Sequence, residues 1–220
     1  MERYWLLTWT TYGTWLPGDR RGFVSEVRDE AGDKVLHNIP GTPCDHDMPA
    51  LKAYASSIMA EDTVWLDVAK AQAVAEQLRE TAEHRGWWVL VLAVMANHVH
   101  VVVGVQGDPD PEKLLGDFKA WATRRLKRGW PGRQHWWTAS GSKRAKKTSE
   151  AIRAAVVYVR DQPSALVVWN EPRVAARLAE LEAERRGEGE RRDDGERSRG
   201  TCPYPGPELI TIAAHCTPVP

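Results

Sequence analysis

Apolar residues occur in short runs and at regular intervals along the chain, and these patterns predict its strands and helices. Residues 4–10 are rich in aromatic and β-favouring side chains and stop close to a glycine, which is typical of a strand. Two longer apolar runs, over 87–95 and 98–104, predict adjacent buried strands joined by a tight turn. We expect a short fourth strand over 135–138, where two tryptophans follow each other.

Three other segments carry apolar residues at helical spacing. The segment 63–85 places its apolar residues on one side and charged residues opposite, and it ends before Gly86. A second helix is expected over 111–129, with a proline at its start. A third is expected over 148–162, where Pro163 ends it.

The order strand, helix, strand, strand, helix, strand is that of the split βαβ arrangement. We therefore expect an α+β, ferredoxin-like fold, with an antiparallel sheet backed by helices and a further helix over 148–162. Residues 1–170 would form one domain, interrupted by an irregular insertion over 13–62 that contains scattered proline and glycine. Residues 171–220 would form a helix and a charged, disordered tail.

Composition excludes several classes of protein. Lysine plus arginine equals aspartate plus glutamate at 30 each, so net charge alone does not indicate a nucleic-acid partner. No apolar run approaches the roughly 20 residues of a membrane span, and the first residues lack the layout of a signal peptide. We therefore expect a cytoplasmic protein without a membrane partner. The three cysteines have no CxxC spacing, which argues against a disulfide framework or a structural zinc site.

Although the whole chain has no net charge, one segment of it is strongly basic. Between positions 113 and 160 the chain has 13 basic residues and 2 acidic ones, a local charge of 13 − 2 = +11. Tryptophans 121, 130, 136 and 137 lie among them, and this mixture suits a surface that holds phosphates and stacks on unpaired bases. A solvated helix face with core tryptophans is the alternative. The candidate DNA-binding residues are Lys119, Arg124, Arg125, Arg128, Arg144, Lys146 and Lys147.

Two pairs of residues could carry chemistry. His98 and His100 are two apart on a predicted strand, so their side chains point the same way and could share a metal ion. Tyr158 and Gln162 are four apart on a predicted helix and would share a face. Either pair alone also has a simple structural explanation, with a histidine at a turn, a tyrosine in the core and a glutamine facing solvent.

The two pairs together resemble a known family. The string from Met95 to Val103, followed about sixty residues later by Tyr-x-x-x-Gln, is similar to the single-tyrosine HUH transposases of the IS200/IS605 type. The repeat-associated (REP-associated) tyrosine transposases are the more similar branch, because the segment 13–19 and the stretch 113–137 also look like theirs. The likeness covers about residues 3–170.

The resemblance implies an endonuclease that cuts and rejoins single-stranded DNA in DNA transposition or recombination. His98, His100 and Gln162 would be the metal ligands, and Tyr158 the catalytic nucleophile that becomes linked to a 5′-phosphate. The cofactor would be a divalent ion, Mg²⁺ or Mn²⁺, and the partner single-stranded or hairpin DNA. Relatives of minimal size lack the insertion over 13–62, so we expect a monomer, with a homodimer as the alternative.

Two other functions fit parts of the pattern. One is a domesticated, non-catalytic protein that binds single-stranded or hairpin DNA on the same fold. The other is a small zinc hydrolase built on His98 and His100, which would require a further ligand and a base from Asp161 or His135.

Overall fold

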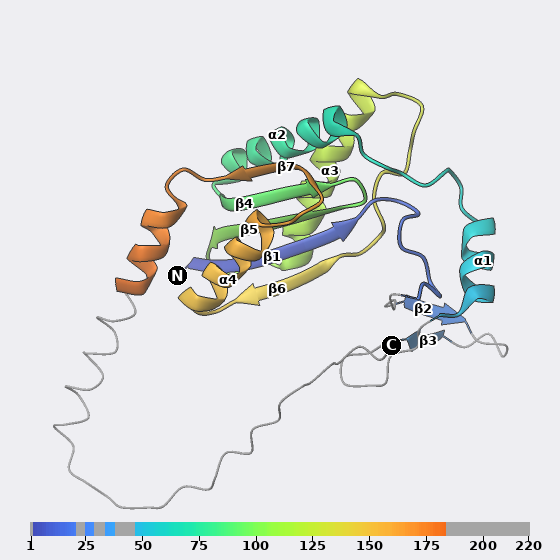
Figure 1. Cartoon of the computed structure of the whole chain (residues 1–220), viewed down its shortest axis with the longest axis horizontal. Helices are drawn as coiled ribbons and strands as arrows, with labels where there is room; N and C mark the ends of the chain where they lie inside the picture. The colour runs from blue at the N-terminus through green and yellow to red at the C-terminus, as the bar shows by residue number, and fades with distance from the viewer. Residues whose placement is uncertain (1, 21–24, 29–33, 38–46, 184–220) are drawn as a thin grey trace, which may run out of the picture. The chain divides into compact units, whose positions relative to one another are not determined.

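The computed structural model describes residues 2–20, 25–28, 34–37 and 47–183, and a five-stranded antiparallel sheet forms its centre (Figure 1). The strand order is β6-β1-β5-β4-β7. The strands are β1 (Glu2–Thr10), β4 (Trp88–Met95), β5 (His98–Gln106), β6 (Ser142–Lys146) and β7 (Ala165–Asn170). Without β7 the order is fourth-first-third-second, which confirms the predicted split βαβ, ferredoxin-like fold.

Helices cover both faces of this sheet (Figure 1). α2 (Val68–Arg85) and α3 (Pro111–Gly129) pack against each other and against one face. α4 (Ser149–Arg160) lies on the opposite face, where its apolar side is buried. The two faces of the sheet are therefore separate environments, one dedicated to the main core and the other shared between α4 and a pocket.

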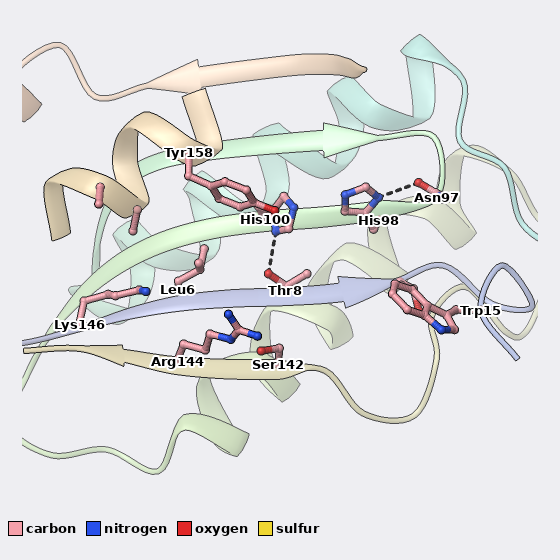
Figure 2. Close-up of a pocket in the computed structure, with 13 residues that line it drawn as sticks. Leu6, Thr8, Trp15, Asn97, His98, His100, Ser142, Arg144, Lys146 and Tyr158 are labelled. Carbon is pink, nitrogen blue, oxygen red and sulfur yellow. Dashed lines mark hydrogen bonds between the residues drawn. The ribbon is translucent and has the colours of Figure 1, made fainter. Parts of the chain in front are cut away.

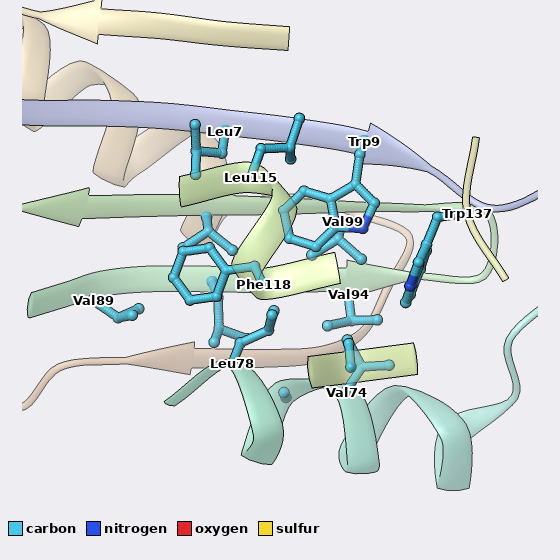
Figure 3. Close-up of a cluster of buried hydrophobic side chains, with 14 of the residues drawn as sticks. Leu7, Trp9, Val74, Leu78, Val89, Val94, Val99, Leu115, Phe118 and Trp137 are labelled. Atoms are coloured by element: carbon cyan, nitrogen blue, oxygen red, sulfur yellow. The ribbon is translucent and has the colours of Figure 1, made fainter. Parts of the chain in front are cut away.

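The alternation of side chains along β5 explains this division. Val99, Val101 and Val103 point into the core between the sheet and the two helices, together with Trp9 of β1 and Phe118 of α3 (Figure 3). The residues between these valines point to the other face. A strand that reads as one apolar run therefore buries valines on one side and presents histidines on the other.

The helices begin where side chains satisfy their first backbone N–H groups. Asp67 accepts a bond from the N–H of Lys70 at 2.8 Å, and Thr148 accepts one from Ala151 at 3.2 Å. Gly86 closes α2 in the left-handed conformation. The predicted helix over 63–85 thus begins five residues late, because 63–67 is extended and lies along the end of the sheet.

The predicted strand over 135–138 is wrong. Trp136 and Trp137 are buried in the core, and this segment makes a single bridge, between Thr11 and Trp137. The fourth strand of the fold is β6, whose basic sequence carries no apolar signal. β7 was not predicted either. It pairs with β4 and forms an edge strand of the sheet.

The insertion over 13–62 contains regular structure as well as loops. It includes the paired strands β2 (Ser25–Arg28) and β3 (Lys34–His37) and the helix α1 (Pro49–Ser57). The ends of the insertion meet: the N–H of Val64 donates to the carbonyl of Tyr12 at 2.9 Å, and Thr11 Oγ1 donates to the carbonyl of Val64 at 2.8 Å. We refer to residues 11, 12 and 64 as the neck of the insertion.

The structure describes the C-terminal part only as far as residue 183. The described residues up to 180 form one compact unit, and the next unit begins at 181. Residues 174–183 are helical, and Arg177 donates to the hydroxyl of Tyr4 at 3.2 Å and pairs with Glu2. The predicted disordered tail from 184 onward lies outside the described residues.

Candidate functional site

A pocket of about 540 Å³ lies on the face of the sheet that carries α4 (Figure 2). Strands β1, β5 and β6, helix α4 and the loop after β1 all contribute to its wall. The lining includes Thr8, Trp15, His98, His100, Arg144 and Tyr158. The pocket thus collects side chains that are far apart in the sequence.

His98 and His100 lie side by side in this pocket, as the two-residue spacing predicts. Their ring centroids are 4.8 Å apart and the rings are nearly perpendicular, at 83°. His100 is buried and His98 half-buried. Both imidazoles therefore face one small volume from the same side of the sheet.

A hydrogen bond orients each imidazole ring. Nδ1 of His100 lies 2.6 Å from the hydroxyl of Thr8 on the neighbouring strand, and Nδ1 of His98 donates to Oδ1 of Asn97 at 2.6 Å (Figure 2). A neutral imidazole that carries its proton on Nδ1 presents a lone pair on Nε2. This is the arrangement by which metal-binding histidines are held in proteins.

Burial keeps His100 neutral. Removal from water, with a smaller contribution from the neighbouring His98, lowers the pKa of His100 to about 4. At neutral pH the ring is therefore unprotonated and able to act as a ligand.

Tyr158 faces the histidines from α4. Its ring centroid is 5.3 Å from that of His100, and 52% of the residue is exposed. A core tyrosine would be covered, so the simple structural explanation for Tyr158 is wrong. The structure brings Tyr158, His98 and His100 into one pocket from two elements (Figure 2).

Gln162 does not join them. α4 ends at Arg160, so position 162 follows the helix and does not line the pocket. Its side-chain amide donates to the backbone carbonyl of Tyr158 at 2.9 Å. The prediction that Tyr158 and Gln162 present side chains to the same site is thus not met in this structure, because the helix ends ahead of Pro163.

The predicted DNA-binding residues fall into two groups, and the first lies in the pocket. Arg144 and Lys146 of β6 line it, opposite Leu6 and Tyr4 of β1 in the strand register. Arg144 and Lys146 occupy alternate positions of β6, so their side chains point to the same face of the sheet. The histidines line the pocket on that face as well. Lys147 is exposed just beyond the end of this strand.

The second group lies on α3, across the sheet from the pocket. Arg125 forms ion pairs with Glu76 and Glu80 of α2. Arg124 stacks on Trp121, with its guanidinium 4.5 Å from the ring centroid. Arg128 is exposed at the end of the same helix. These residues are distant in the fold from Tyr158, since a sheet separates α3 from α4.

Lys119 of α3 has a structural position. Its ammonium donates to the carbonyls of residues 138, 139 and 140, and burial lowers its pKa to about 8. It therefore fixes the loop that leads into β6. The predicted contact with DNA is not supported by this environment.

The tryptophans also fall into two groups, those buried in the core and one that lines the pocket. Trp136 and Trp137 belong to the core, which contradicts their suggested role as stacking surfaces. Trp15, which sequence reasoning did not single out, lines the pocket and is 41% exposed. Thr8 and Asn97 were missed as well, since nothing in the sequence shows which hydroxyl or amide will meet a histidine.

The residues proposed for a zinc hydrolase are engaged elsewhere. His135 stacks on Tyr12 with ring centroids 5.2 Å apart, and Asp161 forms an ion pair with Arg160. Within the described ranges, no three side chains of the types His, Cys, Asp and Glu gather closely enough to hold a metal. In the same part of the chain, no helix is long and apolar enough to cross a membrane.

The structure thus has the arrangement expected from the sequence: a ferredoxin-like sheet with two adjacent histidines that face a tyrosine on a later helix. Residues 60–162, which include these three side chains, match the model of a family described as IS200-like transposases. This match supports the expected resemblance of the chain to the IS200-like transposases. No significant match was found among curated proteins.

Two solved structures are similar to the chain. One is a REP-associated tyrosine transposase bound to a REP hairpin, with 13% identity, a TM-score of 0.40 and coverage of 74% of this chain and 75% of that one. The other is a Deinococcus radiodurans protein described as a candidate transposase, with 16% identity, a TM-score of 0.40 and coverage of 72% and 88%.

Proposed function

We propose that the protein is a metal-dependent endonuclease and strand transferase that acts on single-stranded DNA through a 5′-phosphotyrosine intermediate. The observation that carries the proposal is the position of Tyr158, whose ring faces His100 and His98 across one pocket. A phenol has an ordinary pKa near 10 and is a weak nucleophile at neutral pH, so it requires an activated phosphate.

The donor set fits a divalent cation. Two oriented imidazoles would hold it through Nε2, and neither adds negative charge that would weaken it as a Lewis acid. When bound, Mg²⁺ or Mn²⁺ would polarise the scissile phosphate and stabilise the leaving 3′-oxygen, and nitrogen ligands favour Mn²⁺ in affinity. Gln162 is proposed as a third ligand, which requires its amide to leave the carbonyl of Tyr158.

The chemistry at Tyr158 conserves phosphodiester bonds. Its Oη bonds to the scissile phosphorus as the bond to the 3′-oxygen breaks, and the phenolic proton is lost while the 3′-oxygen gains one. A 3′-hydroxyl of another strand then attacks the phosphotyrosine, which restores the phenol and forms a new diester. Because one diester replaces another, the transfer requires neither ATP nor water.

The basic strand β6 would hold the DNA backbone. Arg144 and Lys146 line the same pocket as Tyr158 and can neutralise phosphates on either side of the reacting one. The proposed substrate is therefore an unpaired strand, either free or beside a hairpin, laid along β1 and β6. A monomer remains our expectation for the active species.

The test is covalent capture of DNA. Purified protein is incubated with 3′-end-labelled single-stranded DNA from the flanks of its own gene, with Mg²⁺ or Mn²⁺, and separated on a denaturing gel. The wild type should carry label only with metal, and Tyr158→Phe should carry none while still binding DNA. Tyr54→Phe is the matched control, because Tyr54 is exposed on α1 and does not line the pocket.

Other outcomes would change the proposal. Label on Tyr158→Phe would exclude Tyr158 as the nucleophile. Binding without any adduct, using flanking DNA that the wild type retains, would favour the non-catalytic single-stranded or hairpin DNA-binding protein instead.

A further inference from the structure

Trp15 occupies one end of the pocket. It lies in the loop after β1, 41% exposed, at the end of the pocket where Asn97 and His98 are found (Figure 2). Lys146 lies toward the opposite end, with the histidines between them (Figure 2). A large aromatic surface is thus open to the same volume as the reactive groups.

The loop that carries Trp15 is fastened to the strand that carries the histidines. The N–H of Thr11 donates to the carbonyl of Asn97 at 2.9 Å, and Thr14 Oγ1 donates to the carbonyl of Thr11 at 2.9 Å. Asn97 in turn accepts the bond from His98 through its side chain. The backbone that leads to Trp15 is therefore anchored beside His98, which limits the entropy lost when the ring is ordered on binding.

The turn before Trp15 has a conformation that demands glycine. Gly13 has a φ of +76°, and a Cβ there would lie 2.3 Å from Cε of Met59 and 2.8 Å from Oγ1 of Thr63. The backbone of Gly13 is therefore packed closely against Met59 and Thr63, which restricts the loop that carries Trp15.

We propose that Trp15 is a base-stacking subsite, which holds an unpaired nucleobase beside the phosphate that faces His98 and His100. The inference rests on the proposed function, because it requires single-stranded DNA in the pocket. Charge favours this occupant, since Arg144 and Lys146 line the same pocket and suit a polyanion. Stacking on an aromatic ring is available to every base, so the subsite would fix the position of a nucleotide without reading its identity.

The test distinguishes binding of the nucleobase from binding of the sugar-phosphate backbone. Binding of wild type and Trp15→Ala is measured by fluorescence anisotropy with a labelled oligothymidylate and with an abasic strand of the same length. Trp15→Ala should weaken oligothymidylate binding by about 5- to 150-fold, the range expected for one lost stack, and leave abasic binding within about twofold. Trp15→Phe should retain most of the affinity because it keeps a ring.

The matched control is Trp65→Ala. Trp65 is 61% exposed but does not line the pocket, so its loss should leave both affinities unchanged. Equal losses on both strands by Trp15→Ala, or no loss on oligothymidylate, would overturn the stacking role while DNA binding itself stands. If the wild type binds neither strand, the proposed function fails and the subsite fails with it.

Discussion

The hydroxyl of Thr8 lies 2.6 Å from Nδ1 of His100, although 92 positions separate the two residues in the chain. They are direct partners in the antiparallel pairing of β1 with β5. The bond fixes both the rotation of the imidazole and the nitrogen that is left for a ligand. Thr8 is therefore a positioning residue for the proposed metal site.

Replacement of Thr8 should weaken metal use without unfolding the protein. Thr8→Val keeps the shape but loses the hydroxyl, and we expect the Mn²⁺ concentration for half-maximal DNA cleavage to rise about 10-fold or more. Thr8→Ser should restore most of the activity because it keeps the oxygen. Thr10→Val, which alters a pocket-lining threonine bonded to Thr138, should leave the metal requirement unchanged.

Acid should destabilise the fold through His100. Its pKa is about 4 when folded and near 6.5 when unfolded, so between these values the unfolded chain binds the extra proton. This destabilisation is small at pH 7 and grows as pH falls toward 4, reaching about 2.5 kcal/mol at pH 4.5. Urea unfolding in EDTA measures this destabilisation. The free energy of unfolding should fall further between pH 7 and pH 4.5 in the wild type than in His100→Gln.

A control histidine sharpens that measurement. His84→Gln alters an exposed position at the end of α2 and should show the same pH-dependent loss as the wild type. If His100→Gln also follows the wild type, protonation of His100 does not oppose folding.

Two arginines on opposite faces of the sheet should behave differently toward DNA. Arg144→Ala removes a charge from the pocket and should weaken single-stranded DNA binding several-fold, with a salt dependence reduced by about one phosphate contact. Arg124→Ala removes the same charge from α3, where the guanidinium stacks on Trp121, and should have little effect. Titrations at three salt concentrations measure both, and a larger effect at Arg124 would place the DNA on the other face.

The core should respond strongly to a cavity at Phe118. This ring is fully buried between α3 and the sheet and meets Trp87 edge-on, with centroids 5.3 Å apart. Phe118→Ala should lower the free energy of unfolding by about 3–5 kcal/mol. Val157→Ala, on the exposed side of α4, should change it by about 0.5 kcal/mol or less. Urea midpoints of the two variants provide the comparison.

Much of the fold is readable from local pattern. The helix over 111–129 was predicted at its observed bounds because the proline at its start and the apolar stripe agree, and in the structure Asp110 caps it. β6 was missed since its sequence, Ser-Lys-Arg-Ala-Lys, is polar on both faces, and backbone pairing with β1 decides its conformation. The strand expected at 135–138 failed because its tryptophans are buried individually without a continuous partner strand.

The candidate site could likewise be predicted only where local spacing along the sequence determines the structure. The spacing of His98 and His100 fixes their common direction, since period-two alternation is a property of any strand. The spacing of Tyr158 and Gln162 was less informative, because it holds only while the helix continues, and α4 ends between them. Thr8 could not have been found, as its role depends on a register set by the whole sheet.

The neck described above makes the long insertion an appendage of the sheet. The N–H of Val64 donates to the carbonyl of Tyr12 at 2.9 Å, so the chain leaves and returns at one point, and a short loop could join β1 to the segment that leads into α2. The segment between can change in length and charge at little expense to the fold. Among the described residues of the insertion, Trp15 near its beginning lines the pocket, so changes farther along the insertion leave the side chains around Tyr158 in place.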